Sequence, residues 1–184
     1  QDVFPIFKIY FNIFMKKISI ITVSFNSEKT ILKTILSVKK QSYKNIEHIF
    51  IDGLSNDNTV NIIKKNMNKK TSILISEKDY GIYHAMNKGI KLSKGEIIFI
   101  LNSDDTFYNK SIIDNIINIF KQNNKLDLIY GNLVFTKKNK IIRRWNAGKY
   151  TNGSFLKGWS PPHPSFIVKK NVYKKYGLFD LRYK

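Results

Sequence analysis

The sequence predicts an α/β domain whose central sheet is mostly parallel and carries helices on both faces. Segments typical of strands alternate four times with segments of helical periodicity up to residue 120. The run at residues 18–25 is β-branched and almost continuously apolar, as expected for a strand buried on both faces. Because strand-helix-strand crossovers are nearly always right-handed, this alternation folds most simply into a parallel sheet between two helical layers.

The first strand-helix unit opens the domain. The strand at residues 18–25 leads into a helix with apolar residues at helical spacing over residues 31–38. Ser27 is the expected N-cap of this helix, and the polar residues 41–45 end it. The second strand is expected at residues 46–51.

The rest of the alternation lies between residues 52 and 120. A polar loop at residues 52–57, in which Asp57 is an expected cap, leads into a second helix around residues 60–67. The remaining elements are a strand at residues 72–76, a helix at residues 82–92, a strand at residues 96–101 and a helix at residues 111–120.

The segment after the fourth strand is less regular. Residues 127–135 and 141–145 flank a lysine-rich turn and predict an antiparallel hairpin added to the main sheet. Residues 148–164 are rich in turn-forming residues and predict a loop.

The two ends of the chain suggest its domain limits. Residues 1–14 are expected to be extraneous or disordered, because Met15 with two following lysines resembles a natural start just before the first strand. Residues 15–184 are expected to form a single domain that is incomplete at its C-terminal end, since only four residues follow Asp180.

Composition narrows the class of protein. Hydrophobic residues make up 42% of the chain, which is enough for a single globular domain with a core. The absence of cysteine excludes a disulfide scaffold and a thiolate metal site, and it fits a reducing compartment. The formal charge of +19 favours an anionic partner, but the lysines are spread in pairs rather than gathered in one arm.

Polar side chains follow each of the four predicted strands. They are Ser24 and Asn26 at the end of the first strand, Asp52 after the second, Asp79 after the third, and Asn102, Ser103, Asp104 and Asp105 after the fourth. Ligands of open parallel sheets bind outside the carboxyl ends of the strands, so we expect Asp52 and Asp104 to line a common cleft. Taken singly, such residues are also common helix caps and turn formers.

The adjacent carboxylates of Asp104 and Asp105 predict a metal site. Neighbouring negative charges repel each other, and a hard divalent cation offsets that repulsion. Mg²⁺ or Mn²⁺ would keep coordination positions open for phosphate oxygens. The chain has no G-x-G-x-x-G turn and no P-loop motif, which disfavours dinucleotide dehydrogenases and P-loop nucleotidases.

Together these motifs resemble those of glycosyltransferase family 2, whose members have the GT-A fold. The resemblance rests on residues 18–27, on residues 51–59 with their Asp-Gly and Ser-x-Asp-x-Thr pattern, and on residues 79–89 with the Asn-Ser-Asp-Asp run. The third motif is similar to the subgroup of surface-polysaccharide (colanic-acid-type) glycosyltransferases. One departure is Asn102, which stands where many members have the first Asp of the D-x-D motif.

The resemblance implies a set of nucleotide-sugar-binding residues. They are Thr22, Ser24, Asn26, Glu28, Asp52, Asp79, Asn87, Lys88, Asn102, Ser103, Asp104 and His163. Asp52 would accept a hydrogen bond from a uracil-type base, and Asp104 would be the main metal ligand, with Asp105 or Asn102 beside it. His163 would lie near the diphosphate and the acceptor, although a plain loop histidine is an equal reading.

The implied reaction is metal-assisted transfer of a sugar, with inversion, from a UDP- or dTDP-linked donor to an acceptor hydroxyl. The acceptor would be a glycan or a lipid-linked glycan, in polysaccharide or glycoconjugate biosynthesis. The general base is expected beyond Lys184, so we assign no catalytic residue. We expect a cytoplasmic protein, with peripheral contact at an anionic inner membrane face through its lysines.

Two other classes of function compete with this one. A nucleotidyltransferase would need a glycine-rich, arginine-containing loop after the first strand, and residues 24–28 contain neither residue. A basic nucleic-acid-binding or membrane-surface module without catalysis would explain the charge. The tyrosines are scattered and form no stacking motif, so no specific nucleic acid is expected.

Overall fold

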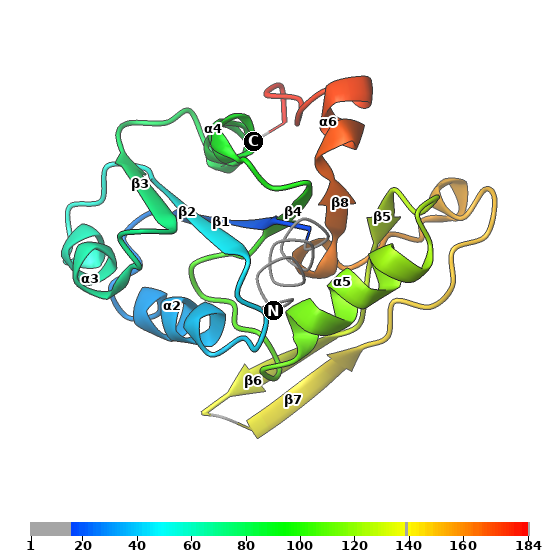
Figure 1. Cartoon of the computed structure of the whole chain (residues 1–184), viewed down its shortest axis with the longest axis horizontal. Coiled ribbons are helices and arrows are strands. Elements are labelled where there is room, and N and C mark those ends of the chain that lie inside the picture. Colours follow the sequence, from blue (N-terminus) through cyan, green and yellow to red (C-terminus); the bar gives the residue numbers. More distant parts are fainter. Residues whose placement is uncertain (1–15, 139, 184) are drawn as a thin grey trace, which may run out of the picture.

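The computed structural model describes residues 16–138 and 140–183 (Figure 1). The prediction made for residues 1–14 lies outside the described residues. The central sheet contains β1 (Ile18–Ser24), β2 (Ile46–Asp52), β3 (Ser72–Ser76), β4 (Ile97–Ile100), β5 (Leu128–Ile129) and β8 (Ile167–Lys169). Their order across the sheet is β3-β2-β1-β4-β8-β5.

Strand pairing confirms the mostly parallel sheet. β1 lies between β2 and β4, β2 also pairs with β3, and all three pairings are parallel. β8 runs antiparallel to β4, and β5 runs antiparallel to β8. The register sets Ser24 opposite Asp52, so the carboxyl ends of β1 and β2 are level and the loops that follow them start side by side.

Helices cover both faces of the sheet, as predicted (Figure 1). They are α2 (Ile31–Lys39), α3 (Thr59–Asn66), α4 (Ile82–Leu92), α5 (Ile112–Gln122) and α6 (Lys170–Tyr176). Successive residues of β1 point to opposite faces. Ile20 packs in one buried cluster with Ile113 of α5, whereas Ile21 packs in another with Ala85 of α4. Phe50 of β2 forms a third cluster with the inner sides of α2 and α3.

Helix α4 lies unusually close to the sheet at Gly89. A Cβ atom added to Gly89 would lie 2.3 Å from Cγ2 of Ile21, far inside any allowed contact. Only glycine at position 89 therefore allows α4 to pack this closely against β1.

Helix α2 begins at Ile31, four residues after its predicted cap. The N-cap is Thr30, and the carbonyl of Ser27 accepts hydrogen bonds from the amides of Thr30 and Ile31, both at 3.0 Å. The hydroxyl of Ser27 instead bonds to the carbonyl of Phe25 and to the hydroxyl of Ser103. The prediction of Ser27 as a cap is thus wrong, because this side chain joins two loops.

The predicted hairpin is present, but its first strand is shorter than expected. β6 (Leu133–Lys137) and β7 (Lys140–Trp145) form a two-stranded antiparallel ribbon. Residues 127–135 are not one strand, since β5 belongs to the main sheet. Between them the amide and carbonyl of Gly131 bond to the hydroxyl of Ser165, at 3.1 and 2.7 Å, which directs the chain out of the main sheet.

The last part of the fold was not predicted. Residues 148–164 are irregular as expected, apart from the 3₁₀ turn η1 (Phe155–Lys157) and the start of a second, η2 (His163–Ser165). β8 and α6 follow directly, and β8 has only three residues, too few for an alternation pattern to reveal. Among the described residues, no helix has the length and apolarity needed to span a membrane.

Candidate functional site

A cavity of about 460 Å³ lies where the loops after β1, β2 and β4 meet. Its lining comes mainly from the first of these loops, with one residue from the second and two from the third. The lining residues are Asn26, Ser27, Glu28, Lys29, Thr30, Asp57, Ser103 and Asp104. The cavity therefore lies at the carboxyl ends of parallel strands, where ligands of such sheets bind.

The loops after β1 and β2 are joined by reciprocal hydrogen bonds. The amide of Glu28 donates to the carboxylate of Asp57 at 3.1 Å, and the carboxylate of Glu28 accepts from the amide of Asn58 at 3.0 Å. The side-chain oxygen of Asn26 accepts from the amide of Asn56 at 3.0 Å. Asn26 has a φ of 47°, a left-handed conformation that asparagine tolerates better than most residues. The two loops thus form one wall.

Asp57 has two roles at this wall. It accepts hydrogen bonds from the amide and hydroxyl of Thr59, the first residue of α3. Asp57 therefore stabilises the start of this helix, although the N-cap residue is its neighbour Asn58. Burial raises the pKa of Asp57, but the hydrogen bonds from Thr59 and from the amide of Glu28 outweigh it and hold the pKa below its usual range. Asp57 therefore presents a charged carboxylate to the cavity.

The loop after β4 is fastened to the same wall from the other side. The hydroxyls of Ser27 and Ser103 are 2.8 Å apart. The hydroxyl of Thr34, on α2, lies within hydrogen-bonding distance of the carbonyls of Ser103 and Asp105, at 2.9 and 2.8 Å. A fully buried side chain thus sets the position from which Asp104 faces the cavity.

The side chains of Asn102, Asp104 and Asp105 fit a hard divalent cation. Oδ1 of Asn102 is buried and has no hydrogen-bond partner, which is costly unless a ligand supplies one. Burial and the charge of Asp104 raise the pKa of Asp105, although a hydrogen bond from Asn102 opposes the shift. Two carboxylates and an amide oxygen are ligands that Mg²⁺ and Mn²⁺ prefer.

The three side chains Asn102, Asp104 and Asp105 are too few to fill the coordination shell of a metal ion by themselves. Within residues 16–138 and 140–183, no group of three or more His, Cys, Asp or Glu side chains is placed to hold a metal ion. Mg²⁺ sites commonly use one or two carboxylates and complete the coordination shell with water and substrate phosphate. The observed donors match that kind of site.

Asp52 lies beneath the cavity and does not line it. Its side chain is fully buried, and its carboxylate accepts hydrogen bonds from the hydroxyls of Ser24, Ser55 and Ser76 and from the amide of Ser55. Four bonds fill the acceptor capacity of a carboxylate. The expectation that Asp52 and Asp104 line one cleft is wrong, because Asp52 is used to tie β1, β2 and β3 together, while Asp57 of the same loop reaches the cavity.

Thr22 and Ser24 also point into the layer under α2 and α3. The hydroxyl of Thr22 lies 2.9 Å from Nε2 of His48, and both side chains are buried. The His48 ring packs on Phe50 with centroids 3.9 Å apart, and burial lowers the pKa of His48 to about 3. Contact of Thr22 with a nucleotide stays a prediction that this buried position does not favour.

Asp79 and Lys88 lie outside the lining of the cavity. Asp79 accepts a hydrogen bond from the amide of Gly81 and approaches Gly53 so closely that a Cβ there would lie 2.8 Å from its carboxylate. Lys88 forms an ion pair with Glu77, at 2.7 Å. The third loop thus contacts the second one, next to the cavity rather than within it.

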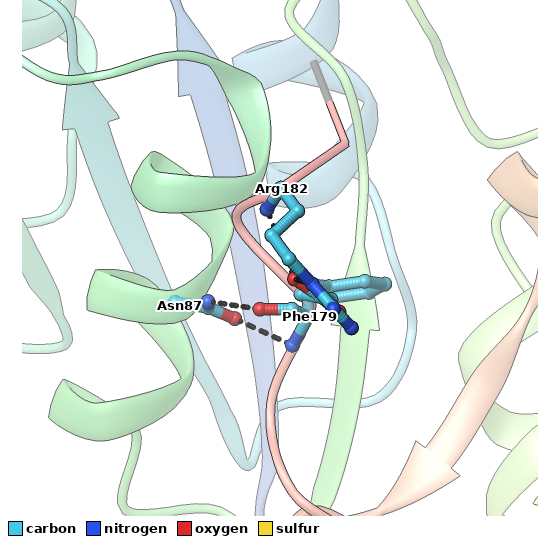
Figure 2. Close-up of polar contacts among 4 residues, drawn as sticks. Asn87, Phe179 and Arg182 are labelled. Atoms are coloured by element: carbon cyan, nitrogen blue, oxygen red, sulfur yellow. Dashed lines mark hydrogen bonds and ion pairs between the residues drawn. The ribbon is translucent and has the colours of Figure 1, made fainter.

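Asn87 uses both atoms of its amide to hold another segment. It donates to the carbonyl of Phe179 at 2.8 Å and accepts from the amide of the same residue at 3.0 Å (Figure 2). The Phe179 ring packs against Tyr83, Tyr173 and His163, with centroids 5.5 to 6.0 Å apart. Partial burial lowers the pKa of His163. Neither Asn87 nor His163 lines the cavity.

The structure thus brings together four of the predicted binding residues, Asn26, Glu28, Ser103 and Asp104. It adds four that were not in the predicted set, Ser27, Lys29, Thr30 and Asp57. Asp57 could have been found from its place in the Ser-x-Asp pattern, whereas the contribution of Lys29 and Thr30 depends on the late start of α2.

Comparison with known proteins gives one family and several relatives. Residues 19–176 match the family described as Glycosyl transferase family 2. A PGL/p-HBAD biosynthesis glycosyltransferase of Mycobacterium bovis (strain BCG / Pasteur 1173P2) is 25% identical over 90% of this chain and 64% of its own length. The Escherichia coli UDP-Glc:alpha-D-GlcNAc-diphosphoundecaprenol beta-1,3-glucosyltransferase WfgD is 33% identical over 76% of this chain and 55% of its own.

Solved structures agree on the fold. Residues 1–349 of S. aureus TarS, in complex with UDP-GlcNAc, superpose with a TM-score of 0.72 and 22% identity, over 87% of this chain and 47% of that TarS chain. The chain spans 64% of the length of the mycobacterial relatives that it matches.

Proposed function

Because the chain belongs to glycosyltransferase family 2, we propose that it binds a nucleoside-diphosphate sugar in the cavity between the loops after β1, β2 and β4 and takes part in transferring the sugar. The GT-A fold implied by the sequence is confirmed by the likeness to TarS. The observation that carries the proposal is the joining of three loops into one cavity that Asp104 faces.

The chemistry of the cavity suits the parts of such a donor. Glu28 and Asp57 offer carboxylate oxygens, which accept hydrogen bonds from ribose hydroxyls or base N–H groups. Ser27, Ser103 and Lys29 offer hydroxyls and a cation, which bind phosphate oxygens. We propose a UDP- or dTDP-linked sugar, as the sequence resemblance implied.

Asp104 would hold a divalent cation at the diphosphate, with Asp105 and Oδ1 of Asn102 beside it. Bound there, Mg²⁺ or Mn²⁺ would supply charge neutralisation for the leaving nucleoside diphosphate. The role of the chain itself is to fix these oxygens: Thr34 holds the loop, and the amide of Asn102 bonds to Asp105 at 3.1 Å. Hydrogen bonds that orient a metal-binding side chain in this way commonly change metal affinity about 10- to 100-fold.

WfgD is named for transfer to a diphosphoundecaprenol-linked sugar, so we propose a glycan or lipid-linked glycan acceptor on the cytoplasmic side, and inversion at the anomeric carbon. We assign no general base among the described residues. The carboxylate of Asp180 forms an ion pair with Arg182, whose guanidinium donates hydrogen bonds to both carboxylate oxygens.

Calorimetry of UDP binding in Mn²⁺ tests the proposal. We expect Asp104→Ala to weaken UDP binding about tenfold or more, because the metal ligand is lost. Asp127→Ala removes an exposed carboxylate outside the cavity and should bind UDP as the wild type does. Equal UDP affinity in Asp104→Ala and wild type would refute the metal assignment, and no UDP binding by any variant would refute the donor site.

Binding of the metal alone gives a readout independent of the nucleotide. Electron paramagnetic resonance of free Mn²⁺ should show uptake by the wild type that Asp104→Ala reduces. The competing view of a basic nucleic-acid-binding module predicts instead tight DNA or RNA binding that falls steeply with salt, and no response to UDP.

A further inference from the structure

Acidic residues are missing from a long part of the chain. Residues 128–179 contain eleven Lys and Arg residues and no Asp or Glu, although the chain as a whole has 13 acidic residues. This stretch therefore carries an excess of positive charge with no acidic residue of its own, although Asp127 just before it acts on Lys175. An excess of positive charge attracts anionic surfaces over about a Debye length.

The same part of the chain carries the most exposed leucine of the described residues. Leu156, at the centre of η1, is 94% exposed, and Phe155 beside it is 61% exposed. Lys157 follows directly, and Lys149 precedes Tyr150, whose ring lies 5.8 Å from that of Phe155. We call Lys149, Phe155, Leu156 and Lys157 the η1 tip.

The η1 tip is held in place by a compact turn. The amides of Leu156 and Lys157 donate to the carbonyls of Gly153 and Ser154, and the amide of Trp159 donates to Ser154 as well. Gly158 has a φ of 77°, which suits glycine and turns the chain back. The exposure of Leu156 is therefore imposed by hydrogen bonds and is not that of a loose loop.

Aromatic rings support the turn from beneath. The Trp159 ring lies 5.4 Å from Phe155, 5.6 Å from Tyr150 and 5.5 Å from Tyr130, and its Nε1–H donates to the carbonyl of Ala147 at 2.7 Å. Phe155 packs against these rings and is still 61% exposed, whereas Leu156 takes no part in the ring contacts and is 94% exposed. Figure 1 shows η1, the golden turn on the right, near the β5 edge of the sheet and at the side of the molecule away from α3.

We propose that the η1 tip is an interfacial anchor that docks on a bilayer containing anionic lipid. Phe155 and Leu156 enter the boundary between headgroups and acyl chains, while Lys149 and Lys157 bond to headgroup phosphates. The surface of such a bilayer offers an apolar layer to the apolar pair and negatively charged headgroups to the two lysines. The anchor rests on the proposed function in one respect: it would bring the chain to a lipid-linked acceptor.

Vesicle co-sedimentation of the full chain tests the anchor. The wild type should sediment with phosphatidylcholine vesicles that contain phosphatidylglycerol, and far less with phosphatidylcholine alone. Leu156→Ser should weaken this binding about tenfold, since it removes one of the two inserted side chains. Leu36→Ser, which alters a 38% exposed leucine on α2, is the matched control and should bind as the wild type does.

In a Trp145→Phe background, which removes the other tryptophan of the chain, the emission of Trp159 reports on the same event. Because the ring contacts Phe155, insertion of the tip should shift its fluorescence to shorter wavelength with phosphatidylglycerol vesicles. UDP binding should be unchanged in Leu156→Ser, which separates the anchor from the donor site. Equal sedimentation of Leu156→Ser and wild type, or wild-type binding that does not depend on phosphatidylglycerol, would overturn the proposal.

Discussion

The buried His48 makes the stability of the fold depend on pH. Its ring lies under α2 and α3, with Nε2 2.9 Å from the hydroxyl of Thr22 and one face on Phe50. Burial lowers its pKa from 6.5 to about 3. His48 is therefore neutral in the folded protein at any pH near neutrality, and it must stay neutral for the fold to persist.

The sign of the effect follows from this lowered pKa. The unfolded chain takes up a proton on His48 as the pH falls below 6.5, whereas the folded chain does not until the pH nears 3. The unfolded state then binds more protons, so stability is full above pH 6.5 and is lost as the pH falls. Between pH 7 and pH 5 the loss attributable to His48 is about 2 kcal/mol, at 1.36 kcal/mol per pH unit.

Urea unfolding at pH 5, 6 and 7 measures this loss. His48→Gln removes the titrating ring and keeps a polar side chain for the hydroxyl of Thr22. The other titrating groups are common to both proteins, so the difference between the two pH profiles isolates His48. We expect the wild type to lose about 2 kcal/mol more than His48→Gln between pH 7 and 5. Parallel profiles would show that His48 takes up its proton in the same pH range in the folded and unfolded protein, and would refute the reasoning.

Three further changes test other contacts. Thr34→Val removes the hydroxyl that bonds two carbonyls of the loop after β4; urea unfolding should show a loss of about 1–3 kcal/mol, and Mn²⁺ titration should show weaker binding. Gly89→Ala sets a methyl group 2.3 Å from Ile21; this overpacking costs about 1–3 kcal/mol, the roughly 1 kcal/mol that alanine gains over glycine in a helix offsets part of it, and urea unfolding should show a net loss of up to about 2 kcal/mol. Asn87→Ala frees both backbone groups of Phe179, so hydrogen exchange should quicken there and stay unchanged in β1.

Each of these changes has a result that would count against it. Gly131→Ala is the control for Gly89→Ala, because a Cβ at Gly131 meets nothing within 4 Å; equal stability of the two variants would disprove the close approach of α4. Unaltered Mn²⁺ binding in Thr34→Val would mean that the loop after β4 keeps its shape without this hydroxyl. Unchanged exchange at Phe179 in Asn87→Ala would show that the ring contacts alone hold the segment.

Most of the sheet was predictable because its elements carry local patterns. The β-branched run of β1 predicts a strand, and the helical spacing in α2 predicts a helix, each from a few neighbouring residues. β5 and β8 have two and three residues, and what defines them is pairing with each other and with β4. No local pattern marks such short strands, so they were merged or missed.

The site was predictable as a region but less so residue by residue. The resemblance located the three loops, and Asp104 faces the cavity as one of the predicted residues. Asp52 and Asp57 lie five residues apart in one polar loop, and sequence could not tell which was buried under three serine hydroxyls. The use of Asn87 was equally hidden, because its partner Phe179 is 92 residues away.

The place of β8 between β4 and β5 imposes an order on folding during synthesis. Leu128 of β5 pairs with Val168, about forty residues further along the chain, and β5 has β8 as its sheet neighbour. β1 to β4 can assemble as soon as they leave the ribosome, but β5 must wait for β8 before its backbone is paired. Until β8 arrives, the open side of β4 is an unpaired edge, so a pause in translation before residue 167 would leave the nascent chain exposed to aggregation.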